Sequence, residues 1–516
     1  MSNTKTIARN AGWYGLENVI SSVVTMVTSI AIARTLGPSK MGYIIYVVWV
    51  ASVASSLGSL GIPATTQKYL AEFIGMEDWG TARYIYFVTL FLQIGLATFA
   101  TIGVLFWVMG DASAGYKLAS ALIVLSIWPS MVNSISAMAN FATEELSANL
   151  PASIISIFVY FTAIAATVVF KWGVIGVGAS TLLMRLVDFL VRLIPTVKRM
   201  LTWGTIHIQP PGLRSRMISF SLQSVATMVA AMIVWDRSEF FLLKHLCTDI
   251  RQIAYYSVAF SMAERLLITS AIFGSASSVT IFAQYGRDKS RLNAITASTF
   301  RYLALTSVPV HFISAALAFP ALLFLYGGQY KGAAMVVTLA PLLCMPKAFI
   351  GPIQSLLQTS ERQSYVILAT VLAGIVDIGV AWYLIPAYGA VGACIGSGAA
   401  QIAAVGLMWS MGIYLYKVKL PWLQVAKITF ASALAALTAH FVAVPLAPLW
   451  AVLCGGTASL IVLFGLLYLL RVLEPEDRVR FRILTGMLPR PIAGPADKIV
   501  SLLIGPDFAN ATPTDI

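Results

Sequence analysis

Residues 142–180 read ATEELSANLPASIISIFVYFTAIAATVVFKWGVIGVGAS, and residues 358–396 read QTSERQSYVILATVLAGIVDIGVAWYLIPAYGAVGACIG. Both stretches run from a polar turn through a long apolar segment to a turn that contains glycine. Four positions align at a constant shift of 216, namely Thr143 with Thr359, Glu145 with Glu361, Gly173 with Gly389 and Gly176 with Gly392. Earlier in each half, a shift near 212 pairs Gly42-Tyr43 with Ala254-Tyr255. The common order and nearly constant offset indicate an internal duplication rather than chance similarity between apolar segments.

The composition indicates a membrane protein. Hydrophobic residues make up 59% of the 516 residues and charged residues 11%, whereas a typical soluble domain holds about 25% charged residues. Stretches without Asp, Glu, Lys or Arg, such as 41–67 and 84–110, exceed the roughly 20 residues that a helix needs to cross the hydrocarbon. The alternating segments of about ten residues that build outer-membrane barrels are missing. We predict an all-α integral membrane protein with about 14 transmembrane helices, among them spans at 12–34, 43–66, 217–240 and 253–282.

The repeat predicts the arrangement of these helices. The shift covers six helices, an even number, so both copies enter the membrane in the same direction. Transporters with parallel repeats pack their halves about an axis along the membrane normal. We therefore predict two parallel six-helix repeats around a central cavity, plus two extra C-terminal helices. The predicted parts are an N-terminal six-helix bundle (1–200), a cytoplasmic linker (201–216), a C-terminal six-helix bundle (217–416), two additional transmembrane helices (417–472) and a cytoplasmic amphipathic tail (473–516).

Lys and Arg predict the orientation. Of the 34 Lys and Arg residues, 25 fall in the alternate loops that include both termini, eight fall in the other loops, and Arg265 lies within a span. Because Lys and Arg concentrate on the cytoplasmic side, we expect a multi-pass protein of the cytoplasmic (inner) membrane with both termini in the cytoplasm. The residues before the first span are polar and end in no cleavage site, so we expect that span to be an uncleaved anchor.

Several function classes are disfavoured. The net charge of +13 is spread through loops, which argues against a nucleic-acid partner. The four cysteines lie far apart and indicate apolar packing rather than disulfides or a zinc site; they are Cys247, Cys344, Cys394 and Cys454. The sequence holds no nucleophile motif, phosphate loop or metal cluster. We therefore predict no catalytic residue, no metal and no cofactor.

Three motifs resemble a known family. They are IAIARTLGPSKMGYIIY after the first span, GIPATTQKYLAEF after the second and YGAVGACIGSGAAQ at the start of the twelfth. They are similar to polysaccharide and O-antigen flippases of the multidrug/oligosaccharidyl-lipid/polysaccharide exporter superfamily, and the number of spans is similar to the related lipid II flippases. The resemblance implies movement of an undecaprenyl-diphosphate-linked oligosaccharide through a polar cavity. In the second copy of the first motif, Cys247 replaces Gly37 and Ala254 replaces Gly42.

Ionisable residues within spans are candidate site residues, because each costs about 2.5–3.5 kcal/mol to insert and therefore faces a cavity by default. Arg34, Arg237, Lys244 and Arg265 are candidates for binding a lipid diphosphate through charge-assisted hydrogen bonds. Structural ion pairs explain Arg237 and Arg265 as well, and snorkelling to the interface explains Arg34 and Lys244. Glu17, Glu264 and Asp377 are candidates for binding a coupling ion, with salt bridges to neighbouring helices as the alternative.

We therefore predict a non-enzymatic flippase that exports a lipid-linked oligosaccharide by alternating access for cell-surface polysaccharide synthesis. Its expected partners are this substrate, membrane lipids, H+ or Na+ as the coupling ion, and other polysaccharide-assembly proteins. A cation-coupled multidrug antiporter of the same superfamily is the first alternative; it should have a cavity of carboxylates and aromatic rings. A membrane glycosyltransferase or ligase is the second alternative, but such chemistry requires positioned acids, bases or a metal, usually on a large outer loop.

Overall fold

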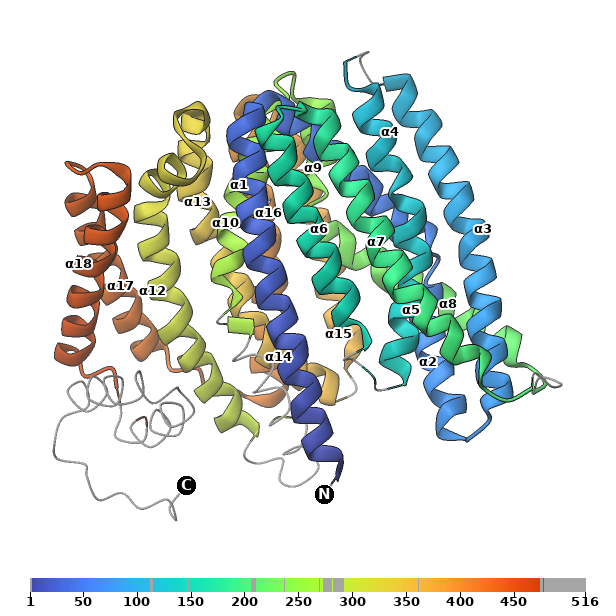
Figure 1. Cartoon of the computed structure of the whole chain (residues 1–516). Helices are drawn as coiled ribbons and strands as arrows, with labels where there is room; N and C mark the ends of the chain where they lie inside the picture. The colour runs from blue at the N-terminus through green and yellow to red at the C-terminus, as the bar shows by residue number, and fades with distance from the viewer. Residues whose placement is uncertain are drawn as a thin grey trace. The chain divides into compact units, whose positions relative to one another are not determined.

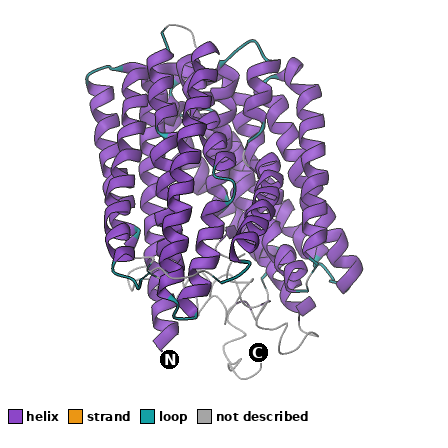
Figure 2. Ribbon diagram, turned by 90° about the vertical axis from the view of Figure 1, so that its right-hand side faces the viewer, coloured by secondary structure: helices purple, strands orange, loops and turns teal. Residues whose placement is uncertain are grey.

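The computed structural model confirms an all-α membrane protein. It describes residues 2–111, 115–143, 145, 148–205, 210–235, 237–268, 270–271, 281, 292–360, 362–473 and 477. This part of the chain consists of helices and connecting loops and contains no strand (Figure 2). Eleven of its helical segments are long and apolar enough to cross a membrane, so the chain is a multi-pass membrane protein. It divides into two compact units, Met1–Tyr255 and Tyr256–Ile516.

Helix α1 (Ser2–Gly58) accounts for two of the predicted spans. Its apolar part, Ile20–Gly58, is 39 residues long, about twice the length of one crossing. Gly37 interrupts the helix with φ 73° and ψ 168°, a conformation that favours glycine, and Pro38 follows it. The spans predicted at 217–240 and 253–282 include residues outside the described part of the chain.

Further helices of the first unit follow α1. They are α2 (Ile62–Gly75), α3 (Trp79–Asp111), α4 (Lys117–Leu125), α5 (Ile127–Ala142), α6 (Leu150–Val169), α7 (Gly173–Leu201), α8 (Leu213–Trp235) and α9 (Glu239–Leu246), and α10 (Arg251–Leu266) crosses into the second unit. Helices α6 and α7 lie side by side (Figure 1). Buried side chains such as Tyr86, Ile123 and Ile135 fill the interior of this unit.

The aligned glycines of the two repeats have the same structural roles. Gly173 (φ 60°) begins α7 and Gly389 (φ 54°) precedes α16 (Ala390–Tyr416), so both turns require a backbone that L-residues rarely adopt. Three residues later, a Cβ on Gly176 would lie 2.5 Å from the Thr167 methyl group, and a Cβ on Gly392 would lie 2.6 Å from the backbone of Leu384. Each glycine therefore allows the two helices of its hairpin to pack closely.

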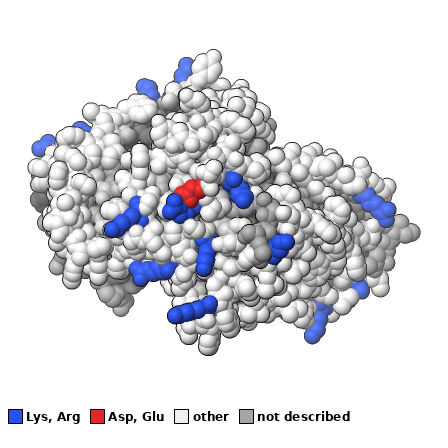
Figure 3. All heavy atoms as spheres, turned by 90° about the horizontal axis from the view of Figure 1, so that it is seen from above, with Lys and Arg blue, Asp and Glu red and all other residues white. Residues whose placement is uncertain are grey.

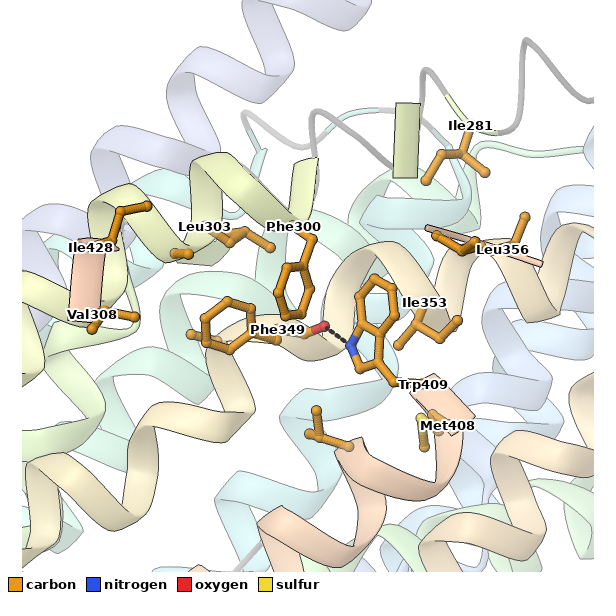
Figure 4. Packing of buried hydrophobic residues seen from close by; sticks show 14 of the residues in the cluster. Ile281, Phe300, Leu303, Val308, Phe349, Ile353, Leu356, Met408, Trp409 and Ile428 are labelled. Carbon is orange, nitrogen blue, oxygen red and sulfur yellow. Dashed lines mark hydrogen bonds between the residues drawn. The ribbon is translucent and has the colours of Figure 1, made fainter. Parts of the chain in front are cut away.

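The helices of the second unit surround a core of aromatic and aliphatic side chains. They include α12 (Leu292–Tyr326), η3 (Gly328–Ala333), α13 (Ala334–Cys344), η4 (Met345–Phe349), α14 (Ile350–Thr359), α15 (Gln363–Tyr388), α16, α17 (Trp422–Ala443) and α18 (Pro448–Leu469). Phe300 packs edge-on against Trp409, with ring centroids 4.7 Å apart. Trp409 donates its indole N–H to the carbonyl oxygen of Phe349 at 3.0 Å (Figure 4). These contacts hold α12, η4 and α16 together.

Helices α17 and α18 follow the last predicted repeat helix and pack against α12. Gly455 permits a close approach, because a Cβ there would lie 2.9 Å from the carbonyl oxygen of Ala439. After α18 the chain returns to the unit. The buried Asp477 carboxylate accepts hydrogen bonds from both terminal nitrogens of Arg301 and from the Tyr302 hydroxyl, and Arg301 also donates to the Val472 carbonyl oxygen at 3.1 Å.

Candidate functional site

Cationic and aromatic side chains gather where α9 packs against α1. Lys244 Nζ lies 5.7 Å from the ring centroid of Tyr46, and Arg237 Cζ lies 6.0 Å from that of Phe240. Trp49 joins the two pairs, with its ring 6.2 Å from Tyr46 and 6.3 Å from Phe240. We call these five residues the α1–α9 cluster. The electron-rich faces of aromatic rings attract cations, so the cluster combines positive charge with flat apolar surface.

Local backbone features explain how α9 reaches α1. Arg237 has φ 61°, which turns the chain sharply before α9 begins. Glu239 lies in the first turn of α9 and Lys244 in its last turn, the arrangement that complements the helix dipole. Glu239 is buried, so the site also contains an acidic side chain. Tyr46 additionally lines a small hollow with Tyr43, Val47, Val50, Trp107 and Val108.

An acidic cap orders the turn after α9. The Asp249 carboxylate accepts the Arg251 backbone N–H at 3.1 Å, which caps α10, and the Arg251 side-chain Nε–H at 2.9 Å. Partial burial would raise the pKa of Asp249, but the hydrogen bonds from Arg251 and Gln252 outweigh it and lower the pKa below its ordinary value. The ionised carboxylate therefore holds this turn in place.

This shift predicts a pH-dependent contribution to stability. The depressed folded-state pKa means that the contribution is fully present above the unfolded value of 3.8 and is lost as the pH falls through the lower folded value. Asp249→Asn keeps a cap but removes the charge, so it should destabilise the protein by up to about 1 kcal/mol at pH 7, as expected for an exposed pair. Thermal unfolding measured from pH 7 to pH 3 should show the difference from the parent shrinking once the pH falls below 3.8. A difference independent of pH would contradict this.

A second polar site lies inside the first unit, on α7. The Asp188 carboxylate accepts hydrogen bonds from Arg192 at 2.8 Å and from Asn133 of α5 at 2.6 Å. Arg192 also donates to Ser153 of α6 at 3.2 Å. The side chains of Arg192 and Asp188 are only 11% and 14% exposed. We call these four residues the α7 polar site.

Polar contacts continue along the same face of α7. Arg199 donates to Asn140 at 2.6 Å and pairs with Glu145, and Asn140 donates to Asn149 at 2.7 Å. Glu145 and Asn149 belong to the polar turn that opens the repeated motif. The turn is thus fixed to α7, and one polar seam joins α5, α6 and α7 inside the unit.

Solved structures identify the fold. A lipid II flippase, MurJ, in an inward closed conformation matches with a TM-score of 0.65 and 14% identity over 89% of this chain and 98% of that chain. A multidrug resistance MATE transporter of the MOP superfamily, facing inward, matches with a TM-score of 0.62 and 16% identity over 77% of this chain and 95% of that chain. This chain has the same fold as these two proteins. A third match is a MOP superfamily transporter from Pyrococcus furiosus, with a TM-score of 0.56 and 15% identity over 80% of this chain and 96% of that chain. Its binding pocket is described as having reversed polarity, which suggests a different function.

Comparisons by sequence assign this chain to no family. No protein-family model matches it, and no curated protein matches it. Among the residues that the structure describes, no group of three or more His, Cys, Asp or Glu is placed to hold a metal ion.

Within the first unit, two of the predicted site residues, Arg237 and Lys244, belong to the α1–α9 cluster. Arg34 is exposed on α1, and the side chain of Glu17 lies outside the described part. The remaining candidates belong to the second unit. There Arg265 donates to the Ser261 carbonyl oxygen at 2.6 Å, Glu264 is half-buried, and Asp377 in α15 is 1% exposed.

The α7 polar site was not among the predicted site residues. Its two charged members are Asp188 and Arg192. In the structure both residues lie in α7, a helix of 29 residues. Their spacing of four residues was the available signal, because residues i and i+4 are neighbours on a helix.

Proposed function

We propose that this chain is a flippase that moves a lipid-linked oligosaccharide of the undecaprenyl-diphosphate type from the cytoplasmic to the outer leaflet by alternating access. The neighbours that share its fold are transporters and flippases. The proposal places the chain in the inner membrane with both termini in the cytoplasm. The fold alone does not identify the substrate. The α1–α9 cluster is the observation that supports a lipid-linked oligosaccharide as the substrate.

The α1–α9 cluster has the chemistry to recognise such a molecule. A diphosphate carries about two negative charges, which Arg237 and Lys244 can bind by charge-assisted hydrogen bonds. The rings of Tyr46, Trp49 and Phe240 offer flat faces with apolar bodies, which suit the hydrophobic faces of sugar rings. Lys and Arg also predominate among the charged side chains visible from above in Figure 3, and such an excess attracts anions. A membrane potential that is negative inside favours outward movement of a dianion by roughly 2 × 2.3 kcal/mol per 100 mV.

The share of the chain that each solved structure covers supports the same assignment. The lipid II flippase structure covers 89% of the chain, whereas the multidrug transporter structures with TM-scores above 0.5 cover 77–83%. More of this chain therefore has a counterpart in the flippase fold than in the multidrug transporters.

A multidrug antiporter is the second candidate function. Buried carboxylates favour it, because Glu239 is 2% exposed within the cluster region and Asp377 is 1% exposed in α15. Glu17, Glu264 and Asp377 remain our candidates for binding a coupling H+ or Na+. Because the same fold hosts a binding pocket of reversed polarity in the Pyrococcus furiosus transporter, the charge of the site should separate the two functions better than the fold.

The test removes positive charge from the cluster. We expect the double variant Arg237→Gln and Lys244→Gln to lower transport of an undecaprenyl-diphosphate-linked oligosaccharide in proteoliposomes at least about tenfold, because each hydrogen bond to a charged group contributes about 1.5–3 kcal/mol. Lys331→Gln is the matched control, since Lys331 is an exposed basic residue on η3. Unchanged oligosaccharide transport by the double variant, together with ion-driven export of a cationic dye by the parent, would favour the antiporter.

A further inference from the structure

Helix α8 packs loosely within the first unit. Among its described side chains only Leu213 is buried, while Ile218 and Leu222 are 62% and 64% exposed. Gly212, with φ 81°, directly precedes α8, and Arg237, with φ 61°, lies two residues after its end. Elements held by few buried contacts are those that open most readily, so α8 has the features of a movable helix.

Helix α8 is held to α2 by a short series of surface contacts. Arg216 donates to both carboxylate oxygens of Glu72, at 2.8 and 3.1 Å, and this pair raises the pKa of Arg216 above its ordinary value. Lys68 Nζ lies 4.0 Å from the ring centroid of Phe220, and the Phe220 ring packs edge-on against Tyr69 at 6.1 Å. Residues with higher numbers in α2 contact residues with lower numbers in α8, so the two segments run antiparallel.

The contact ends in a close approach of two backbones. The Ser221 hydroxyl donates to the Leu60 carbonyl oxygen. A Cβ on Gly61 would lie 2.5 Å from the Ser221 carbonyl oxygen, so only glycine fits there. Leu60 has φ 47° and Gly61 has φ 70°, which makes a tight turn between α1 and α2. We call the contacts of Leu60–Glu72 with Arg216–Ser224 the α2–α8 clasp.

The clasp differs in kind from the α7 polar site. The side chains of Arg216 and Glu72 are 54% and 23% exposed, and water screens such a pair so that it contributes little. The Asp188–Arg192 pair is largely buried, and a buried pair is costly to break. Opening the clasp separates the buried Tyr69 ring from Phe220 but leaves no buried charge. Opening the seam between α5, α6 and α7 would leave a buried charge without its partner.

We propose that the α2–α8 clasp is a reversible gate and that α8 swings away from α2, about Gly212 and Arg237, during each transport cycle. The proposal rests on the alternating-access function proposed above and names the contact that this function opens. Arg237 belongs to the α1–α9 cluster and lies two residues after the end of α8, so movement of α8 changes the position of a proposed substrate-binding cation. The seam keeps α5, α6 and α7 together as one body during this movement.

The first test measures exposure of the clasp directly. In a full-length background with the four cysteines replaced by Ala, Ser224→Cys places a thiol beside Gly61. We expect Glu72→Gln or Arg216→Gln to raise its rate of labelling by a charged maleimide about two- to fivefold, the factor expected for loss of an exposed pair. The charge-swapped double variant Glu72→Arg with Arg216→Glu should return the rate to near the parent value. Equal labelling rates in all four proteins would overturn the proposal.

The second test holds the clasp closed. Glu72→Cys with Arg216→Cys, joined by a short thiol-reactive cross-linker that a reductant cleaves, should stop oligosaccharide transport, and the reductant should restore it. Thr98→Cys with Trp128→Cys is the matched control, since Trp128 of α5 donates to the Thr98 hydroxyl of α3 at 3.1 Å within the first unit; its cross-link should leave transport unchanged. Full transport by the cross-linked clasp would overturn the gate. If the labelling rate changes in the variants but the parent transports no oligosaccharide, the results support the gate and contradict the proposed substrate.

Discussion

Replacing Asp188 by Asn should destabilise the first unit strongly. The substitution leaves the largely buried Arg192 guanidinium without its carboxylate, and breaking a buried pair by removing one partner costs about 3–5 kcal/mol. At roughly 2–4 °C per kcal/mol for a unit of this size, the apparent Tm of the purified protein should fall by about 6–20 °C. Differential scanning fluorimetry in detergent measures this.

The double variant Asp188→Asn with Arg192→Met is the control for this prediction. Removing both charges leaves no uncompensated ion, and replacing a buried pair with apolar side chains is often neutral. Most of the lost stability should therefore return. A double variant as unstable as Asp188→Asn alone would mean that Asn133 and Ser153, rather than the ion pair, hold the α7 polar site together.

Replacing Asp477 by Asn should have a comparable effect on the second unit. Asp477 is fully buried and Arg301 is 6% exposed, and the carboxylate satisfies Arg301 and Tyr302 at once. The free energy of unfolding should again fall by about 3–5 kcal/mol. It should also free the chain after α18, which limited proteolysis would detect as faster cleavage C-terminal to Leu469.

Tyr302→Phe is the matched variant for the second prediction. It removes one hydrogen bond to the Asp477 carboxylate and keeps the ion pair, so it should cost less stability, about 1.5–3 kcal/mol. Equal losses for Tyr302→Phe and Asp477→Asn would show that the charge of Asp477 is unimportant and that only packing at this point matters.

Much of the fold could be predicted from the sequence because its signals are local. Apolar stretches marked the helices, and Gly37-Pro38 marked the division of α1. The departure at Cys247 was also informative. Cys247 is extended, with φ −117° and ψ 132°, whereas Gly37 has φ 73°, so the second copy makes its turn differently and relies on the cap formed by Asp249.

The candidate site was harder to predict because its contacts join distant positions. Nothing near Asp477 in the sequence reveals that its carboxylate pairs with Arg301, which lies 176 residues earlier. The sequence likewise predicted Lys244 as a ligand for phosphate, but its placement over Tyr46 depends on the packing of α9 against α1. The predicted amphipathic tail at 473–516 lies outside the described residues, apart from Leu473 and Asp477.

The paired hairpins at Gly173 and Gly389 also bear on the origin of the chain. Both glycines adopt positive φ, and both are followed three residues later by a glycine that admits no side chain. Two independent inventions of this geometry at matching positions would be a coincidence, so the hairpins support the internal duplication predicted from the sequence. Under that prediction a half-length ancestor would already have formed the hairpin, and two identical copies of it would have assembled.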